Sequence, residues 1–375
     1  MRALSTTVFV SLAVVFGLLG EVRAYDPPPR LTVTEVHFSG WAESQAITLK
    51  YNATTYVEPP EWTAAESEPA AYKKGTGPVK VRANFTFLPA YVDEAYVKAE
   101  PVLENPLGDL GQELVTFTNG YSGLVEFTAT GSIPGYVRAF YAWWQWKYRY
   151  ADPVDWLTAN STKDEVYVLL DTPKAPMSEP WVNGVLDRAV DWAWGQSTTA
   201  GVVSAITSHL YNSGATWDGK DQHFTYPGGN NFHLSALLSG FPNVEMDCRD
   251  FANFLHVLTN ALGVNGYARV LDKGFWRGDE WVDDPYGFDT NWLYPAGGSP
   301  DTFTPWEFHQ VGWFSNIADA SAQVDNDSDP GNPPHSWKLA KGDMGQEAYL
   351  DKLVVPEDRG EMDDVGTFTC SIVYP

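Results

Sequence analysis

The feature that most constrains the fold of this chain is a long stretch, from Leu31 to Leu170, in which apolar and polar residues alternate with a period of two. Such alternation is typical of β-strands with one buried face, because successive side chains point to opposite sides of a strand. Clusters of Pro, Gly, Asn and Asp separate the segments, as turns require. We therefore predict an antiparallel β-sandwich of about 140 residues. The expected strands are Leu31–Phe38, Ala46–Tyr51, Val79–Phe87, Leu114–Thr118, Gly123–Thr128 and Glu165–Leu170.

One further segment, Phe140–Tyr150, is strongly aromatic and has two distinct faces. The first face carries Phe140, Ala142, Trp144, Trp146, Tyr148 and Tyr150, and the second carries Tyr141, Trp143, Gln145, Lys147 and Arg149. One interpretation is an aromatic platform for sugar rings. The other is a core strand whose second face packs against a neighbouring domain, and we favour it because large aromatic side chains are mostly buried.

The hydrophobic pattern changes after a Pro-rich segment at 171–180, which is typical of a linker. Helical spacing follows in Trp181–Trp194, in Val202–Tyr211 and beyond Cys248. Helices followed by strands indicate an α+β layout. We predict a β-sandwich domain at 25–172, a linker at 173–180 and an α+β domain at 181–375. The strands expected in the last of these are Tyr267–Leu271, Trp306–Phe314 and Leu350–Val355.

The first 24 residues have the pattern of a secretory signal peptide. Arg2 precedes an apolar run from Val8 to Leu19, and a small-x-small site predicts cleavage after Ala24. We therefore expect a secreted, periplasmic or cell-surface protein. The run is too short to span a bilayer and no later apolar stretch reaches about 20 residues, so no membrane insertion is expected.

The charge balance limits the classes of partner that the chain is suited to bind. Acidic residues outnumber basic ones 48 to 24, which gives a formal net charge of −24. Such a chain is a poor match for nucleic acids or anionic membrane surfaces, because both are themselves negatively charged. A protein or peptide substrate is the expected partner.

Cys248 lies where a loop runs into a strongly apolar helix. Asp247 is suited to cap that helix and Gly263 to end it. Unpaired backbone N–H groups and the positive end of the helix dipole lower the pKa of a thiol in the first turn, which favours a reactive thiolate. A buried structural cysteine remains an alternative. So does a disulfide with Cys370, the only other cysteine, since disulfides are common in exported proteins.

A catalytic thiol requires a base and a group that orients the base. Among seven histidines, His256 lies eight residues beyond Cys248 on the same helix, too far to reach the thiol. His309 lies in an apolar strand, which holds a side chain rigidly. Asp319 begins an adjoining segment, and in a hairpin its carboxylate would approach the far nitrogen of His309. The pattern predicts a triad of Cys248, His309 and Asp319, with Asp325 as the alternative third member.

Together these residues resemble the transglutaminase-like superfamily over about residues 185–325. The resemblance rests on Asp-Cys-Arg-Asp-Phe-Ala from Asp247, a helix ending in Ala-Leu-Gly-Val, the strand Tyr-Ala-Arg-Val, and a strand histidine followed by Asp-Ala-Ser. It implies a papain-like α+β core with Cys248 as nucleophile, His309 as base and Asp319 as orienting carboxylate. The chain departs from the family at Val311, where an aromatic residue is usual, and in a long acidic, aromatic insertion before His309.

The resemblance implies a cysteine-dependent acyl transferase or peptidase that acts on protein or peptide amides through a thioester. An amine acceptor gives transamidation and water gives hydrolysis, and no cofactor is required. The backbone N–H of Cys248 would stabilise the oxyanion, together with an upstream donor, Trp217 or Gln222. Two alternatives stay open: a non-catalytic binding module for peptides or glycans, and a structural surface protein in which the two cysteines are bridged.

Asp325, Asp327 and Asp329 alternate as the ligands of a calcium loop do. However, Pro330 occupies the position where such a loop requires Gly, and Ser336 stands where a bidentate Glu is expected. We therefore favour a solvated acidic turn, with a partial calcium site as the alternative.

Overall fold

The computed structural model describes residues 29–150, 155–218, 224, 231–277, 280–283, 287–303, 306, 308–360, 362–368 and 371–372. Only the backbone is described at 274–277, 280–283, 363–368 and 371–372. The predicted signal peptide at 1–24, Gln222 and Cys370 lie outside the described residues. The fold is rich in β-structure, with 38% strand and 19% helix. No helix within the described ranges is both long and apolar enough to cross a membrane.

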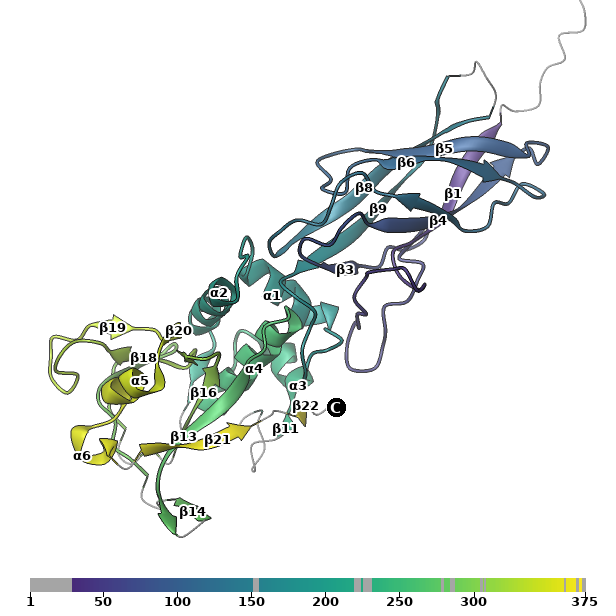
Figure 1. The fold of residues 1–375 in the computed structure, drawn as a ribbon. Coiled ribbons are helices and arrows are strands. Elements are labelled where there is room, and N and C mark those ends of the chain that lie inside the picture. The colour runs from purple at the N-terminus through teal and green to yellow at the C-terminus, as the bar shows by residue number, and fades with distance from the viewer. Residues whose placement is uncertain are drawn as a thin grey trace, which may run out of the picture.

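Two sheets form the N-terminal half of the chain, at one end of an elongated molecule (Figure 1). The first has the order β2 (Trp62–Thr63), β1 (Arg30–His37), β4 (Lys80–Leu88) and β7 (Val125–Thr128). The second has the order β3 (Ala70–Lys73), β9 (Leu157–Leu169), β8 (Arg138–Arg149), β5 (Glu94–Pro101) and β6 (Leu110–Thr116). Every pairing is antiparallel except that of β3 with β9. One hydrophobic core receives side chains from both sheets, as expected for a sandwich.

The aromatic strand β8 contributes the largest side chains of this core. Trp144 and Trp146 are fully buried, and the ring of Trp146 lies 5.3 Å from that of Phe85 on the opposite sheet. Each indole N–H has a partner, the carbonyl of Gly108 for Trp144 and the hydroxyl of Thr162 for Trp146. The interpretation of β8 as a core strand is therefore confirmed.

The outer face of β8 differs from the prediction. It was expected to pack against a neighbouring domain, but Tyr141 on this face is 51% exposed. The ammonium group of Lys163 lies over the Tyr141 ring at 3.9 Å from its centroid. A cation that stacks on an aromatic ring lets that ring stay at the surface without a neighbouring domain.

One predicted strand of the sandwich, Ala46–Tyr51, is wrong. Within it only Lys50 forms bridges, one with Tyr56 and one with Trp181. The alternation arises because Leu49 is buried and Ile47 packs beside it in the core of the C-terminal half. An irregular segment that buries one side can thus show the same two-residue alternation of apolar and polar residues as a strand.

The C-terminal half combines helices with antiparallel sheets and two short parallel strand pairs. Its first helical elements are η1 (Val182–Leu186), α1 (Asp187–Trp192), α2 (Thr199–Tyr211), α3 (Leu234–Gly240) and α4 (Cys248–Ala261). The main sheet has the order β14 (Glu280–Asp283), β13 (Tyr267–Arg277), β16 (Phe308–Trp313), β17 (Ile317–Ala318) and β20 (Lys341–Met344), and β21 (Met362–Phe368) also pairs with β13. Helix α4 packs against β13 and β16.

Smaller elements complete this half. The order β15 (Leu293–Pro295), β18 (Ala322–Asp325) and β19 (Trp337–Lys338) forms a separate sheet. Two short parallel pairs join β10 (Thr216–Trp217) to β12 (Glu245–Met246) and β11 (Asn231–Phe232) to β22 (Ser371–Ile372). The last helices are α5 (Gln346–Leu353) and α6 (Pro356–Arg359).

The predicted strand Leu350–Val355 is wrong, because α5 occupies most of it. Tyr349, Leu350 and Leu353 are the buried residues of this helix, and they recur with helical spacing. A short apolar run does not distinguish a strand from a helix by periodicity alone.

The Pro-rich segment predicted as a linker is packed between the two halves. Met177 and Trp181 are 1% and 2% exposed. The backbone N–H of Asp171 donates to the carbonyl of Leu262, the residue that follows α4. Tyr167 of the sandwich shares one hydrophobic core with these residues, so apolar packing is continuous from one half to the other.

Candidate active site

The N-terminus of α4 places the cysteine against β16. Asp247 caps the helix by accepting the N–H of Asp250 at 2.9 Å, and the Asp250 side chain accepts the N–H of Asp247 at 3.2 Å. Arg249 donates to the other oxygen of Asp247 at 2.7 Å. This double cap sets the first turn, in which Cys248 is the first residue. The predicted helix start and cap are confirmed.

Cys248 is a free thiol, 5% exposed, and Cys370, its partner in the disulfide that the sequence left open, lies outside the described residues. The backbone of Gln310 forms a hydrogen bond with the sulfur. The side-chain amide of Gln310 donates to Asn253 of α4 at 3.4 Å. These contacts place the sulfur beside the strand residue that directly follows His309.

The acidity of the thiol differs from the prediction. Burial raises the pKa of Cys248 far above its ordinary value, and the charge of Asp247 raises it further. The Gln310 backbone and Arg249 lower it by less. Desolvation therefore outweighs the helix terminus in this closed site. The thiol becomes a nucleophile only if a base inside the site takes its proton.

His309 and Asp319 are brought together by a β-hairpin. β16 and β17 pair antiparallel, with Gly312 opposite Ala318, and Asp319 follows β17 directly. The Nε2 atom of His309 lies 2.9 Å from Oδ2 of Asp319, and the two side chains are 0% and 1% exposed. The predicted approach of this carboxylate to the far nitrogen of His309 is confirmed.

Asp319 is held as a carboxylate by four hydrogen bonds. Its Oδ1 accepts the backbone N–H and the hydroxyl of Ser321 at 2.8 and 2.7 Å, and its Oδ2 accepts the hydroxyl of Tyr349 at 2.6 Å. Burial raises the pKa of Asp319, but His309, Tyr349 and Ser321 together bring it below the usual range. The carboxylate is therefore charged and accepts a hydrogen bond from the N–H at Nε2 of His309.

This assignment leaves the other ring nitrogen of His309 as the basic atom. With the proton on Nε2, as the hydrogen-bond network requires, Nδ1 of the neutral ring carries a lone pair. Nδ1 is buried and has no hydrogen-bond partner among the described residues. A buried nitrogen without a partner is uncommon. His309 directly precedes Gln310, whose backbone forms a hydrogen bond with the Cys248 sulfur.

Aromatic rings close the other side of the histidine. The centroid of Trp306 lies 4.4 Å from that of His309, and Trp217 lies 5.8 Å from Trp306. The indole Nε1 of Trp217 is buried and has no partner within the part of the chain that the structure describes. Of the two predicted oxyanion donors, Trp217 thus offers an unpaired N–H on a ring that contacts Trp306, the neighbour of the histidine, whereas Gln222 lies outside the described residues.

The alternative third member, Asp325, is not part of this cluster. Its Oδ2 lies 2.8 Å from Nδ1 of His335, and its Oδ1 accepts the N–H of Ser336 at 2.8 Å. Asp327 likewise accepts the N–H of Asp329 at 2.8 Å, as in a turn. Across the described ranges no three His, Cys, Asp or Glu side chains converge as metal ligands.

Sequence reasoning did not identify Tyr349. It lies next to the run that was predicted as a strand, and only the helical geometry of α5 directs it at Asp319. His256, by contrast, is a structural residue as expected. Its Nε2 lies 2.9 Å from the Asn260 amide, and burial lowers its pKa to about 4, so it stays neutral.

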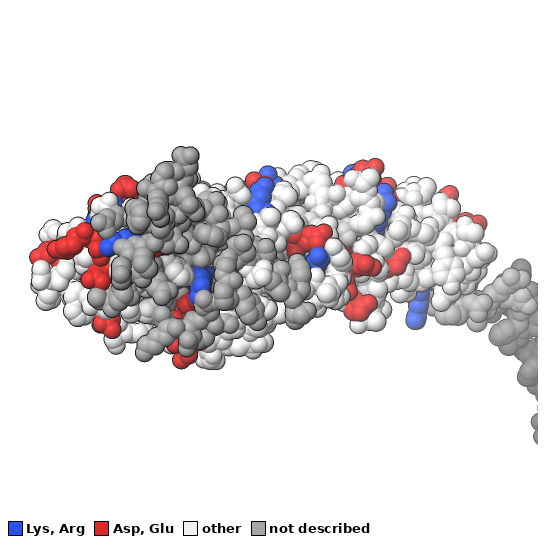
Figure 2. Space-filling view, turned by 90° about the horizontal axis from the view of Figure 1, so that it is seen from below, with Lys and Arg blue, Asp and Glu red and all other residues white. Residues whose placement is uncertain are grey.

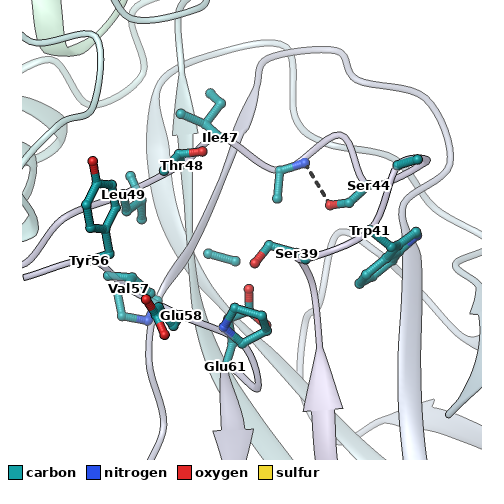
Figure 3. Close-up of a pocket in the computed structure, with 16 residues that line it drawn as sticks. Ser39, Trp41, Ser44, Ile47, Thr48, Leu49, Tyr56, Val57, Glu58 and Glu61 are labelled. Atoms are coloured by element: carbon teal, nitrogen blue, oxygen red, sulfur yellow. Dashed lines mark hydrogen bonds between the residues drawn. The ribbon is translucent and has the colours of Figure 1, made fainter.

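A separate pocket of about 600 Å³ lies in the N-terminal half, under the loop that follows β1 (Figure 3). Trp41 and Tyr56 stand on opposite sides of it, and Ser39, Glu58 and Glu61 come from the same loop. Glu61 is 2% exposed, and its carboxylate accepts the N–H of Phe38 at 2.8 Å. This pocket shares no residue with the cluster around Cys248.

The surface agrees with the acidic composition. Figure 2 shows Asp and Glu along the length of one face of the molecule, with Lys and Arg in isolated positions.

A comparison of the chain with protein families and with curated proteins finds no match. What the chain can do must therefore be derived from its own geometry.

Proposed function

We propose that this chain is an exported cysteine-dependent acyl transferase or amidase of the transglutaminase-like type, acting on protein or peptide amides. The observation that carries the proposal is the buried His309, with Nε2 bonded to a charged Asp319 and Nδ1 unpartnered, on a strand that contacts the sulfur of Cys248. Nucleophile, base and orienting group in this order form the arrangement that cysteine acyl transfer requires.

The chemistry follows from the atoms available. Nδ1 of His309 takes the thiol proton, and the sulfur of Cys248 attacks the amide carbonyl carbon. The oxyanion receives hydrogen bonds from the first backbone N–H groups of α4 and from Nε1 of Trp217. His309 then returns the proton to the departing ammonia or amine, which leaves a thioester. An amine or water attacks the thioester and releases the free thiol.

The proposal extends to the domain arrangement and the destination of the protein. In this proposal the helix that begins with the nucleophile and packs on the strand of the base belongs to a papain-like α+β domain, and the sandwich is the N-terminal domain. The signal-peptide pattern of residues 1–24 supports export.

The test is mass spectrometry of a peptide library incubated with a primary amine, scored for cleavage, deamidation and amine incorporation together. All three products should disappear in Cys248→Ala while the thermal melt stays within a few degrees of the wild type. Products that persist in Cys248→Ala, or their complete absence from the wild type with every peptide, would contradict the proposal.

The N-terminal pocket favours a second candidate, a binding module for peptides or glycans. Two aromatic rings and hydroxyl groups suit a sugar, whereas the carboxylates of Glu58 and Glu61 suit a basic peptide, since neither forms an ion pair with another described residue. Calorimetric titration of Cys248→Ala with neutral oligosaccharides and with lysine-rich peptides tests it. Saturable binding that Glu58→Gln weakens supports the module, and Glu66→Gln, at an exposed acid outside the pocket between β2 and β3, is the matched control.

A further inference from the structure

We propose that Tyr349 is a positioning residue of this site, whose hydroxyl shares one oxygen of Asp319 with His309 and so weakens the hold of that carboxylate on the histidine. The inference rests on the proposed function, because it assigns Tyr349 a role only if His309 is the base for Cys248.

The Tyr349 hydroxyl lies within hydrogen-bond distance of both Asp319 and His309. Oδ2 of Asp319 lies 2.6 Å from the Tyr349 hydroxyl and 2.9 Å from Nε2 of His309, and the hydroxyl is itself 3.1 Å from that Nε2. The two rings are nearly parallel, at 16° with centroids 6.3 Å apart. All three side chains are at most 1% exposed. The hydroxyl thus belongs to the same closed network as the base and cannot be replaced there by bulk water.

In the hydrogen bond between Tyr349 and Asp319, the phenol is the donor. Burial raises the pKa of Tyr349 far above its ordinary value, and the charges of Asp319 and Cys248 raise it further, so the phenol keeps its proton and donates it. A carboxylate oxygen with two donors is less basic than one with a single donor. Tyr349 therefore reduces the extent to which Asp319 stabilises the imidazolium that forms when His309 accepts the thiol proton.

The charged or titratable groups in and around this network come from four elements. Cys248, Asp247 and Arg249 belong to the start of α4, His309 to β16, Tyr211 to α2 and Tyr349 to α5. Only His309, Tyr349 and Ser321 donate side-chain hydrogen bonds to Asp319 among the described residues. Ser321 uses the opposite oxygen, so Tyr349 is the one donor that competes with the histidine directly.

Helix α5 is fixed at both ends, which makes the position of the hydroxyl definite. At its start, Arg269 of β13 donates to the side chain of Gln346 at 2.6 Å. At its end, the Asn291 amide donates to the carbonyls of Val354 and Lys352 at 2.9 and 3.2 Å. Tyr349 lies between these anchors. Its hydroxyl is therefore placed by the sheet that carries His309 and by the segment that precedes β15.

The test compares Tyr349→Phe with Tyr72→Phe. Both variants lose the hydroxyl of a Tyr that is at most 1% exposed; that of Tyr72 donates to the Phe38 carbonyl at 3.2 Å in the distant sandwich core. The readout is the pH dependence of iodoacetamide alkylation at Cys248, followed on its own peptide by mass spectrometry so that Cys370 does not contribute. His309→Gln identifies the part of the profile that depends on the base.

Removing the Tyr349 hydroxyl makes Asp319 more basic and favours the thiolate–imidazolium pair. The rising limb of the wild-type profile should therefore move to lower pH by about 0.5 in Tyr349→Phe. It should not move in Tyr72→Phe, although both variants melt at a lower temperature than the wild type. A structural role alone would lower the melting temperature without moving the limb.

The other outcomes separate the two proposals. A limb that depends on His309 but is unchanged in Tyr349→Phe overturns the role of Tyr349 and leaves the proposed function standing. A wild-type profile that His309→Gln does not alter overturns both.

Discussion

Two His–Asp pairs lie in the described part of the C-terminal half, and they differ in what surrounds them. His309 and Asp319 lie 2.9 Å apart, and His335 and Asp325 lie 2.8 Å apart. Each histidine also contacts a Trp ring, Trp306 at 4.4 Å and Trp292 at 5.0 Å. By sequence pattern and by local geometry alone, either pair could be the base and orienting group of a catalytic site.

Burial and the choice of nitrogen separate the pairs. His309 is fully buried and binds its carboxylate through Nε2, so Nδ1 is the ring nitrogen without a partner among the described residues. The His335 side chain is 16% exposed and binds Asp325 through Nδ1. What makes the His309 pair the better candidate for catalysis is that its second nitrogen has no partner among the described residues and that water is excluded from it. The pair of His335 and Asp325 instead joins the two ends of the loop between β18 and β19.

The largest predicted difference between the pairs is in acyl transfer. His309→Gln should lower the rate by about 10³-fold, since a positioned base contributes about 10²–10⁴-fold. His335→Gln should change the rate by less than about twofold, because the partly exposed pair of His335 and Asp325 contributes only about 0–1 kcal/mol to the stability of the fold. The rate of amine incorporation into a Gln-containing peptide measures both. Equal losses in the two variants would remove the distinction drawn between the pairs.

The second prediction concerns the Trp residues beside each pair. Trp217→Phe keeps an aromatic ring but removes the unpaired indole N–H, and should lower kcat by about 10²-fold with little change in KM. Trp292→Phe, next to His335, is the matched control and should leave kcat unchanged. Steady-state kinetics at fixed amine concentration decide the question. A loss confined to KM would assign Trp217 to substrate binding instead of oxyanion stabilisation.

A smaller effect is expected on stability in acid. The pKa of Asp319 lies below its ordinary value in the folded state, so its contribution is complete at neutral pH and is lost as the pH falls below the ordinary carboxyl range. Asp319→Asn should therefore destabilise the protein by about 1–3 kcal/mol at pH 7 and by much less near pH 2. Urea unfolding at both pH values measures this. Asp325→Asn should show the same sign with a smaller amplitude, because its partner is nearer to solvent.

The smallest expected effect is that of calcium. Both oxygens of Asp325 already accept hydrogen bonds, from His335 and Ser336, so adding Ca²⁺ at millimolar concentration should move the melting temperature by less than about 1 °C. Differential scanning calorimetry with and without a chelator measures the shift. An increase of several degrees that Asp327→Asn abolishes would restore the calcium loop as the correct interpretation.

The sequence predicted those parts of the site that depend on local patterns. The start of α4 was recognisable because Asp247 and an apolar stripe act within one or two turns. The contact between His309 and Asp319 was recognisable because a hairpin brings close neighbours in sequence together. In both cases the relevant physics acts over at most about ten residues.

What the sequence did not predict depends on tertiary packing. Tyr349 reaches Asp319 only because α5 is anchored by Arg269 and Asn291, which no local pattern reveals. The pKa of Cys248 was expected to fall at a helix terminus, but it rises because neighbouring elements exclude water. Burial of this kind is a property of the assembled fold.

The arrangement of α5 has a consequence for biosynthesis. Cys248 leaves the ribosome well before His309, and Tyr349 emerges later still, so the hydrogen-bond network around His309 is completed only after α5 has been translated. A chain that ends before His309 would carry the thiol without its proposed base. Such a chain could not carry out the proposed acyl transfer, which would become possible only after β16 has been translated and has folded onto α4.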